Sequence, residues 1–203
     1  MKFIVGTKQN MTQIFDDNGR VHPVTLVKVS PLVVTQVKEA AGKDGYAAVQ
    51  VGYGTRVAKN VNKAMTGHAK GLGSFAGLKE FKGEGFTVGD KIELSTFAAG
   101  DDVTVSSISK GKGFQGVVKR HGFKGGPRSH GQKHSEREPG SIGGAGRDGG
   151  RVAKGKRMAG RTGGDRITTK GLTVVKVLPD LGEIYISGAI AGRRGTVVEI
   201  VSK

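Results

Sequence analysis

The chain has 203 residues, 36 of them glycine and none cysteine, and its 33 Lys and Arg against 17 Asp and Glu give a formal net charge of +16. The lack of cysteine excludes disulfide scaffolds, thiolate metal sites and cysteine nucleophiles. The longest apolar run has four residues, at 46–49, whereas a membrane-spanning helix needs about 20, and the N-terminus does not resemble a secretory signal. We therefore expect a soluble, intracellular, strongly cationic protein whose partner is a polyanion.

Residues 1–108 and 171–203 carry a net charge of only +4 and have the pattern of short β-strands. Residues 20–29 alternate apolar and polar side chains, which places Val21, Pro23, Thr25, Val27 and Val29 on one face. Similar patterns predict strands over residues 31–38, 46–53, 86–94, 103–108, 172–178, 183–190 and 196–201. Residues 60–70 are the one segment that predicts a helix.

Turn signals separate these strands at residues 17–19, 42–45, 88–90 and 179–182. Many short β-branched strands joined by glycine turns indicate a mainly β fold, either a closed barrel or a sandwich. Because the last three strands are too few to be stable alone, both flanks should form one body.

Residues 109–170 differ sharply from their flanks. They hold 16 Lys and Arg but only Glu136, Glu138, Asp148 and Asp165 as acids, together with 17 glycines and 11 hydrophobic residues. So little apolar surface does not offset the cost of ordering a chain. We expect no core of its own here, mobility in the free protein, and ordering when phosphates neutralise the charge. The alternative is a flexible basic linker without a defined bound shape, although its varied sequence, with Phe and Pro spaced through it, argues against this.

Three stretches imitate nucleotide sites. Gly111, Gly113 and Gly116 fit the dinucleotide-binding pattern, as do Gly144, Gly146 and Gly149, but the sequence after Gly116 is too glycine-rich for the helix that the motif requires. The third, residues 150–157, resembles a phosphate-binding loop, yet Arg157 replaces the hydroxyl residue that binds magnesium. We therefore predict no nucleotide cofactor.

The histidines of the basic segment are the remaining candidates for a metal site. His130 and His134 are four apart, with His121 nearby, but a glycine between them disfavours the helix on which two such ligands converge. We predict no metal site and expect these rings to stack on bases or to donate to phosphates. No grouping of Ser, His and Asp or isolated carboxylate pair indicates catalysis, so we do not expect an enzyme.

Six motifs together resemble one known family. They are GTKQNMTQIF (6–15), VNKAMTGHAK (61–70), SKGKGFQGVVKRHGF (109–123), SHG (129–131), EPGSIG (138–143) and GKRMAGRTGGDRIT (155–168). In this order they resemble the large-subunit ribosomal protein L3 family, in its bacterial form.

The resemblance implies a mainly β fold: a closed six-stranded barrel like that of translation factors, with a small α+β insertion at about 55–95. Residues 1–108 and 171–203 would form the barrel body, and residues 109–170 a long basic extended arm that penetrates RNA. It further implies a structural component of the bacterial large ribosomal subunit that binds 23S ribosomal RNA near its 3′ end early in assembly.

The resemblance also implies a place for the end of the arm, near the peptidyl transferase centre. The residues concerned are Pro139, Gly140, Ser141, Ile142, Gly143 and Gly144. The expected partners are ribosomal RNA and neighbouring ribosomal proteins, with no membrane, no small-molecule substrate, no cofactor and no homo-oligomer.

The expected RNA contacts are cations and imidazoles that bind phosphates and 2′-hydroxyls with little reading of bases. On the outgoing limb they are Lys110, Lys112, Lys119, Arg120, His121, Lys124, Arg128, His130, Lys133, His134 and Arg137. On the return limb they are Arg147, Arg151, Lys154, Lys156, Arg157, Arg161 and Arg166. Two alternatives remain open: a DNA-compacting protein with basic glycine-rich tails, and a nucleotide-dependent protein that uses residues 150–156.

Overall fold

The structure is a computed structural model that describes residues 1–42, 44–69, 71–144, 146 and 149–202. The chain divides into two compact units, Met1–Ile108 with Arg166–Lys203, and Ser109–Asp165. We call the first the barrel unit and the second the arm. No helix within the described ranges combines the length and apolar character needed to cross a membrane.

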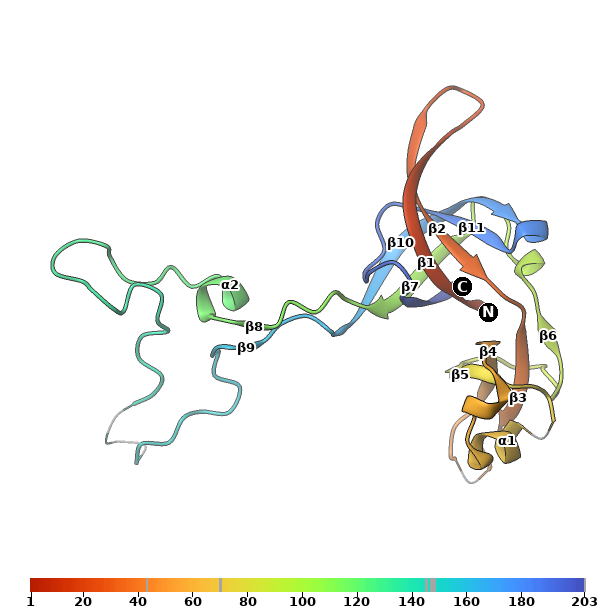
Figure 1. Cartoon of the computed structure of the whole chain (residues 1–203), viewed down its shortest axis with the longest axis horizontal. Coiled ribbons are helices and arrows are strands. Elements are labelled where there is room, and N and C mark those ends of the chain that lie inside the picture. Colours follow the sequence, from red (N-terminus) through yellow and green to blue (C-terminus); the bar gives the residue numbers. More distant parts are fainter. Residues whose placement is uncertain (43, 70, 145, 147–148, 203) are drawn as a thin grey trace. The chain divides into compact units, whose positions relative to one another are not determined.

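Six antiparallel strands of the barrel unit close into a barrel in the order β1-β12-β7-β10-β11-β2 (Figure 1). Within the barrel, closure pairs every strand with two neighbours and so removes the open sheet edges that would favour aggregation. The mainly β fold and the closed barrel confirm the prediction. The barrel strands are β1 (Lys2–Phe15), β2 (Val21–Val29), β7 (Asp102–Ile108), β10 (Arg166–Leu178), β11 (Glu183–Ser187) and β12 (Val197–Ser202).

The barrel core follows from the alternation in these strands. In β11, Ile184 and Ile186 are fully buried while the residues between them are not, and in β12 Val198 and Ile200 follow the same rule. Val27 of β2 meets them in the same cluster. Each such side chain contributes about 1.5–3 kcal/mol of burial energy relative to full exposure.

A second sheet, of order β5-β4-β3-β6, packs against the barrel. Phe3 of β1 stacks on Phe81 of β5, with ring centroids 4.5 Å apart, and Lys79 Nζ lies 2.7 Å from Glu199 Oε1 of β12. The sheet and the barrel therefore share one hydrophobic core. Its strands are β3 (Leu32–Lys38), β4 (Ala48–Thr55), β5 (Phe75–Phe81) and β6 (Lys91–Ile92).

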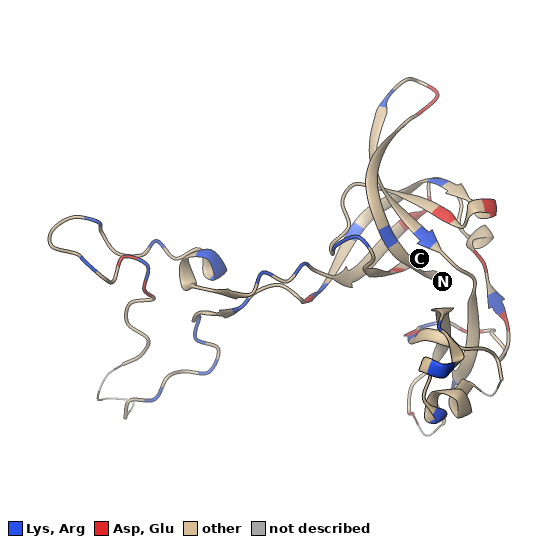
Figure 2. Cartoon of the chain, in the orientation of Figure 1, with Lys and Arg blue, Asp and Glu red and all other residues tan. Residues whose placement is uncertain are grey.

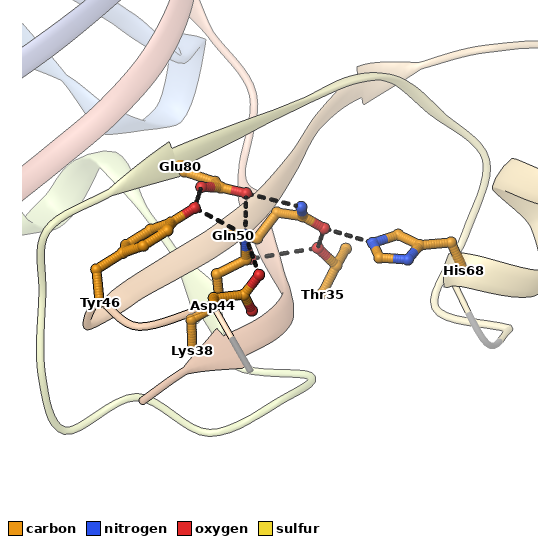
Figure 3. Close-up of polar contacts among 7 residues, drawn as sticks. All are labelled: Thr35, Lys38, Asp44, Tyr46, Gln50, His68 and Glu80. Atoms are coloured by element: carbon orange, nitrogen blue, oxygen red, sulfur yellow. Dashed lines mark hydrogen bonds and ion pairs between the residues drawn. The ribbon is translucent and has the colours of Figure 1, made fainter. Parts of the chain in front are cut away.

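A polar network ties the outer side of this sheet together (Figure 3). Lys38 Nζ lies 2.8 Å from Glu80 Oε1, and the Tyr46 hydroxyl donates to Glu80 Oε2 at 2.8 Å. Gln50 links this pair to His68, because its amide reaches both Glu80 and the imidazole. The hydrogen bonds from Lys38 and Tyr46 lower the pKa of Glu80, and the bond to Glu80 raises that of Lys38.

The helix predicted over residues 60–70 is present as α1 (Lys63–Ala69). The Asn62 side-chain oxygen accepts the Met65 backbone N–H at 2.8 Å, which satisfies one free donor of the first turn. Lys70 lies outside the described residues. Single turns of 3₁₀-helix complete the unit: η1 (Ala58–Asn60), η2 (Leu94–Thr96) and η3 (Pro179–Leu181).

Two predicted strands need correction, and two strands of the barrel unit were not predicted. Residues 86–94 contain only β6, because Asp90 accepts both the backbone N–H and the hydroxyl of Thr87 and folds residues 87–90 into a turn. The strands β1 and β5 were missed. Strand β10 begins at Arg166 and not at residue 172, since residues 166–169 already pair with β7 ahead of an irregularity in the register between Thr169 and Leu172.

The arm contains little regular structure. Its elements are β8 (Phe114–Gln115), β9 (Gly160–Arg161) and α2 (Val117–His121). The helix corrects the prediction that no helix follows Gly116: Gly116 and Gly122 flank it, so glycine bounds the helix without interrupting it. Among the described arm residues Val117 is the one that is buried, in agreement with the expected lack of a core.

Candidate nucleic-acid interface

The outgoing and return limbs of the arm pair with each other at the first and last residues of the arm. Ser109 N donates to Asp165 O at 2.9 Å, Lys112 N to Thr162 O at 2.8 Å, and β8 pairs with β9. Gly163 makes this pairing possible, because its φ is +76° and a Cβ there would lie 2.1 Å from Lys110 O. The limbs thus lie side by side as a narrow ribbon at β8 and β9 (Figure 1). Lys110, Lys112 and Arg161 are exposed on it.

The helix α2 docks on the return limb through one carbonyl. Arg120 Nη1 donates to Met158 O at 2.8 Å, and His121 Nε2 lies 3.0 Å from the same oxygen. Because a carbonyl only accepts, His121 carries its proton on Nε2 in this arrangement. Two predicted RNA ligands are therefore held in place by the return limb, while the rest of the Arg120 guanidinium stays exposed.

Aromatic residues of the arm lie beside its cations. The Arg157 guanidinium carbon is 5.9 Å from the Phe123 ring centroid, and the His121 ring is 6.1 Å from it. Phe114 is 73% exposed, the largest exposed fraction of any large hydrophobic residue in the described ranges. The predicted site did not include Phe114; the available signal was an aromatic residue in a segment too poor in apolar residues to bury it.

Residues 125–138 form a loop closed on itself. Gly126 N donates to Glu136 O at 3.0 Å, and Arg128 Nε lies 3.5 Å from Glu136 Oε2. His130, at the turn, has φ 60°, a left-handed backbone conformation rare outside glycine. The loop exposes Lys133, among other cations, at its surface.

The predicted tip residues surround a small hollow. Ser141 Oγ donates to Gly143 O at 3.2 Å, and the hollow, of about 250 Å³, is lined by Ser141, Ile142, Gly143, Gly144, Gly150, Arg151 and Val152. Pro139 and Gly140 precede it and are exposed. Arg147, a predicted RNA ligand, lies outside the described residues.

The charge of the arm is almost uncompensated (Figure 2). Its lysines and arginines in the described ranges are all exposed: Lys110, Lys112, Lys119, Arg120, Lys124, Arg128, Lys133, Arg137, Arg151, Lys154, Lys156, Arg157 and Arg161. Among these described residues, the pair of Arg128 with Glu136 is the sole ion pair. Exposed like charges that lack acidic partners create a strong positive potential, which a polyanion neutralises.

Arg166 differs from the other predicted ligands. It opens β10 in the barrel unit, and its Nη2 bonds Glu199 Oε2. Burial raises the pKa of Glu199, but hydrogen bonds from Lys79 and Arg166 outweigh it, so the pKa is lowered. The carboxylate stays ionised and holds Arg166 on the barrel.

The sequence motifs that imitate other sites lack the structure those sites need. The strand before Gly111 belongs to an antiparallel barrel and α2 has five residues, so no βαβ unit surrounds the first glycine motif. No helix follows the phosphate-loop imitation at residues 150–157 within the described chain. The described part also holds no group of three His, Asp or Glu side chains placed to bind a metal.

Comparison with known proteins gives a consistent result. A family model described as ribosomal protein L3 matches residues 54–183. The chain is 46% identical to large ribosomal subunit protein uL3c of Guillardia theta over 202 residues, which cover 97% of this chain and 98% of that protein. It is 47% identical to uL3 of Roseiflexus sp., covering 97% and 95%, and 44% identical to uL3 of Chlorobium limicola, covering 100% and 99%.

Proposed function

Because the chain belongs to the ribosomal protein L3 family, we propose that its arm binds large-subunit ribosomal RNA. Members of this family are structural proteins of the ribosome and not enzymes, and in bacteria the ribosome lies in the cytoplasm. The chain accordingly has a structural role in translation.

The observation that carries the proposal is the unpaired charge of the arm. Its exposed cations lie on both limbs, and in the described part a single carboxylate, that of Glu136, pairs with one of them. Lysine and arginine bind phosphate oxygens and release condensed counterions, so binding of this kind weakens steeply with salt. The predicted ligands are proposed to act in this way, with Arg166 the least available because Glu199 already holds it.

The arm is proposed to gain order from the RNA that surrounds it. With Val117 as its one buried residue in the described ranges, apolar burial contributes little to its fold. Phosphate neutralisation then supplies the free energy that orders the limbs, as in other segments that fold on binding. His130 and His134 are proposed to donate to phosphates or to stack on bases.

The partner is proposed to be 23S ribosomal RNA, bound near its 3′ end early in assembly by a single copy of the chain. Residues 139–144 are proposed to reach toward the peptidyl transferase centre. The family resemblance supports this placement, and the composition of the tip agrees with a positioning role. Pro, Gly, Ser and Ile offer no acid or base for catalysis, and glycine lets the backbone approach RNA closely.

Deletion of the arm tests the proposal directly. Ile108 and Arg166 are opposite each other in the β7–β10 pair, so an Asn-Gly turn can join them in place of Ser109–Asp165. The deletion ends at Asp165 because residues 166–169 form part of the barrel. The shortened chain should melt cooperatively as a folded barrel but lose tight binding to transcribed 23S RNA.

Two comparisons complete the experiment. Binding of the full chain to duplex DNA of equal charge at moderate salt separates an RNA-binding protein from a DNA-compacting one, since the proposal requires a preference for the RNA. Undiminished RNA binding by a folded, shortened chain would contradict the proposed role of the arm.

A further inference from the structure

The hairpin that joins β1 to β2 extends beyond the barrel (Figure 1, red and orange). Strand β1 pairs with β12 from Lys2 to Thr7, and β2 pairs with β11 from Val24 to Lys28. Past these points, within the described chain, the two strands pair with each other and with no third strand. We call residues 9–22 the outer hairpin; both of its edges are open, whereas Pro23 O accepts the backbone N–H of Gly188.

One face of the outer hairpin carries three exposed large apolar side chains, together with the polar Gln13. The register sets Met11 opposite Thr25, Gln13 opposite Pro23, and Phe15 opposite Val21, and since every second residue shares a face, all six lie on the same one. Met11 is 47% exposed, Phe15 60% and Val21 51%. Further along β2, the residues on this same face, Thr25, Val27 and Val29, are buried in the barrel.

The apolar alternation of a buried strand face continues here into a part of the hairpin that is exposed. The alternation over residues 20–29 predicted that Val21 and Pro23 share one face with Thr25, Val27 and Val29. They do share it, but Val21 and Pro23 are exposed where the other three are buried. A contiguous exposed apolar face on a soluble protein marks an interaction site or an aggregation hazard.

The outer hairpin has little of the lysine protection that is usual at an open edge. Natural proteins place lysine on exposed edge strands to prevent pairing with other chains, yet residues 9–22 contain one cation, Arg20, in a chain that has 33 Lys and Arg. An uncovered edge of this kind is retained where another chain covers it. With two acids against one cation, the outer hairpin also disfavours RNA as the molecule that covers it.

The charge at the turn indicates the chemistry of the partner. Residues 9–22 carry two acids, Asp16 and Asp17, against one cation, Arg20. The Asp16 carboxylate accepts the backbone N–H groups of Arg20 and Asn18, at 2.8 and 3.0 Å, and the Arg20 bond is the main cause of its lowered pKa. Asp17 is exposed. An anionic turn beside an apolar face repels phosphates and attracts cations.

We propose that the outer hairpin docks a second protein of the large ribosomal subunit, through an apolar segment of that protein flanked by lysine or arginine. The inference rests on the proposed function, which places the chain in that particle. Apolar side chains of the partner cover Met11, Phe15 and Val21, and its cations face the turn. Pairing of two copies through this hairpin is disfavoured because Asp16 and Asp17 of one copy would face the same acids of the other.

Site-specific crosslinking in the assembled particle tests this inference. The full chain, with p-benzoylphenylalanine in place of Phe15, is incorporated into large subunits, which are purified by sedimentation and irradiated. A matched probe in place of Leu181, which is 62% exposed in η3, serves as the control. The Phe15 probe should give one discrete adduct with a basic protein of the subunit, in at least fivefold higher yield than the same adduct from the Leu181 probe.

Other outcomes overturn the inference in distinguishable ways. An adduct with RNA alone, an adduct with another copy of the chain, or no adduct from a chain that sediments with the subunit each refutes the docking of a protein and leaves the proposed function standing. Failure of the unsubstituted chain to sediment with the subunit refutes both.

A second measurement uses no probe. The double variant Met11→Ser with Phe15→Ser changes exposed side chains, so it should melt at the temperature of the parent chain and bind 23S RNA equally well. Subunits that contain it should retain the crosslinked protein about tenfold less well after a salt wash, since truncation of a central aromatic contact has effects of this size. Leu181→Ser should change nothing, and full retention by the double variant overturns the inference.

Discussion

Replacing three arm lysines by glutamine should flatten the salt dependence of RNA binding. Lys124, Lys133 and Lys154 are exposed and have no carboxylate partner within the described residues. Each phosphate contact contributes about 0.7–0.9 to the slope of log K against log salt concentration. The triple variant should therefore reduce the slope by about two to three units and weaken binding roughly a hundredfold at about 0.15 M salt.

The assay is the anisotropy of labelled 23S RNA fragments, titrated with protein at several salt concentrations. The control variant replaces Lys28, Lys82 and Lys91, which are exposed in the barrel unit, so both variants lose the same net charge. The control should change the slope by less than half as much. Equal flattening by the two variants would mean that net charge acts at long range, and an unchanged slope in the arm variant would refute phosphate contact by these lysines.

Three further changes give separate readouts. Gly163→Ala should increase amide exchange at the paired ends of the arm far more than Gly164→Ala. Both glycines have φ near +75°, but only at Gly163 would an added Cβ meet a carbonyl oxygen, at 2.1 Å. Equal exchange in the two variants would contradict this. Phe114→Ser should weaken RNA binding roughly tenfold without changing the salt slope if the ring stacks on a base, measured by the same anisotropy titration. Hydrogen bonds hold the pKa of Glu80 below its ordinary range, so ionised Glu80 stabilises the fold above that range, and this stabilisation disappears as the pH falls through the lowered pKa. Glu80→Gln should therefore make the melting temperature depend less on pH in the acid range. An unchanged dependence would contradict this.

The barrel could be predicted where a strand has one face on the core. Strands β11 and β12 alternate cleanly because the closed sheet has an inside and an outside. Strand β1 was missed because four consecutive residues, Phe3 to Gly6, are buried, and the register then shifts between Lys8 and Met11. Both features erase the period of two on which the prediction depends.

Some properties of the candidate site could be predicted from composition, and others could not. The position of the charge and the lack of a core follow from counts over residues 109–170. The pairing of limbs, by contrast, depends on hydrogen bonds between residues about 50 positions apart, such as Lys112 with Thr162, and no local pattern encodes them. The assignment of Arg166 to β10 depends equally on its partner strand.

The place where the arm joins the barrel affects how the chain can diverge in evolution. Ile108 and Arg166 face each other on neighbouring strands, so whatever number of residues lies between them begins and ends at one point of the sheet. Insertions and deletions there leave the pairing of all six barrel strands unaltered. Selection can therefore adjust the length and composition of the intervening segment independently of the stability of the barrel.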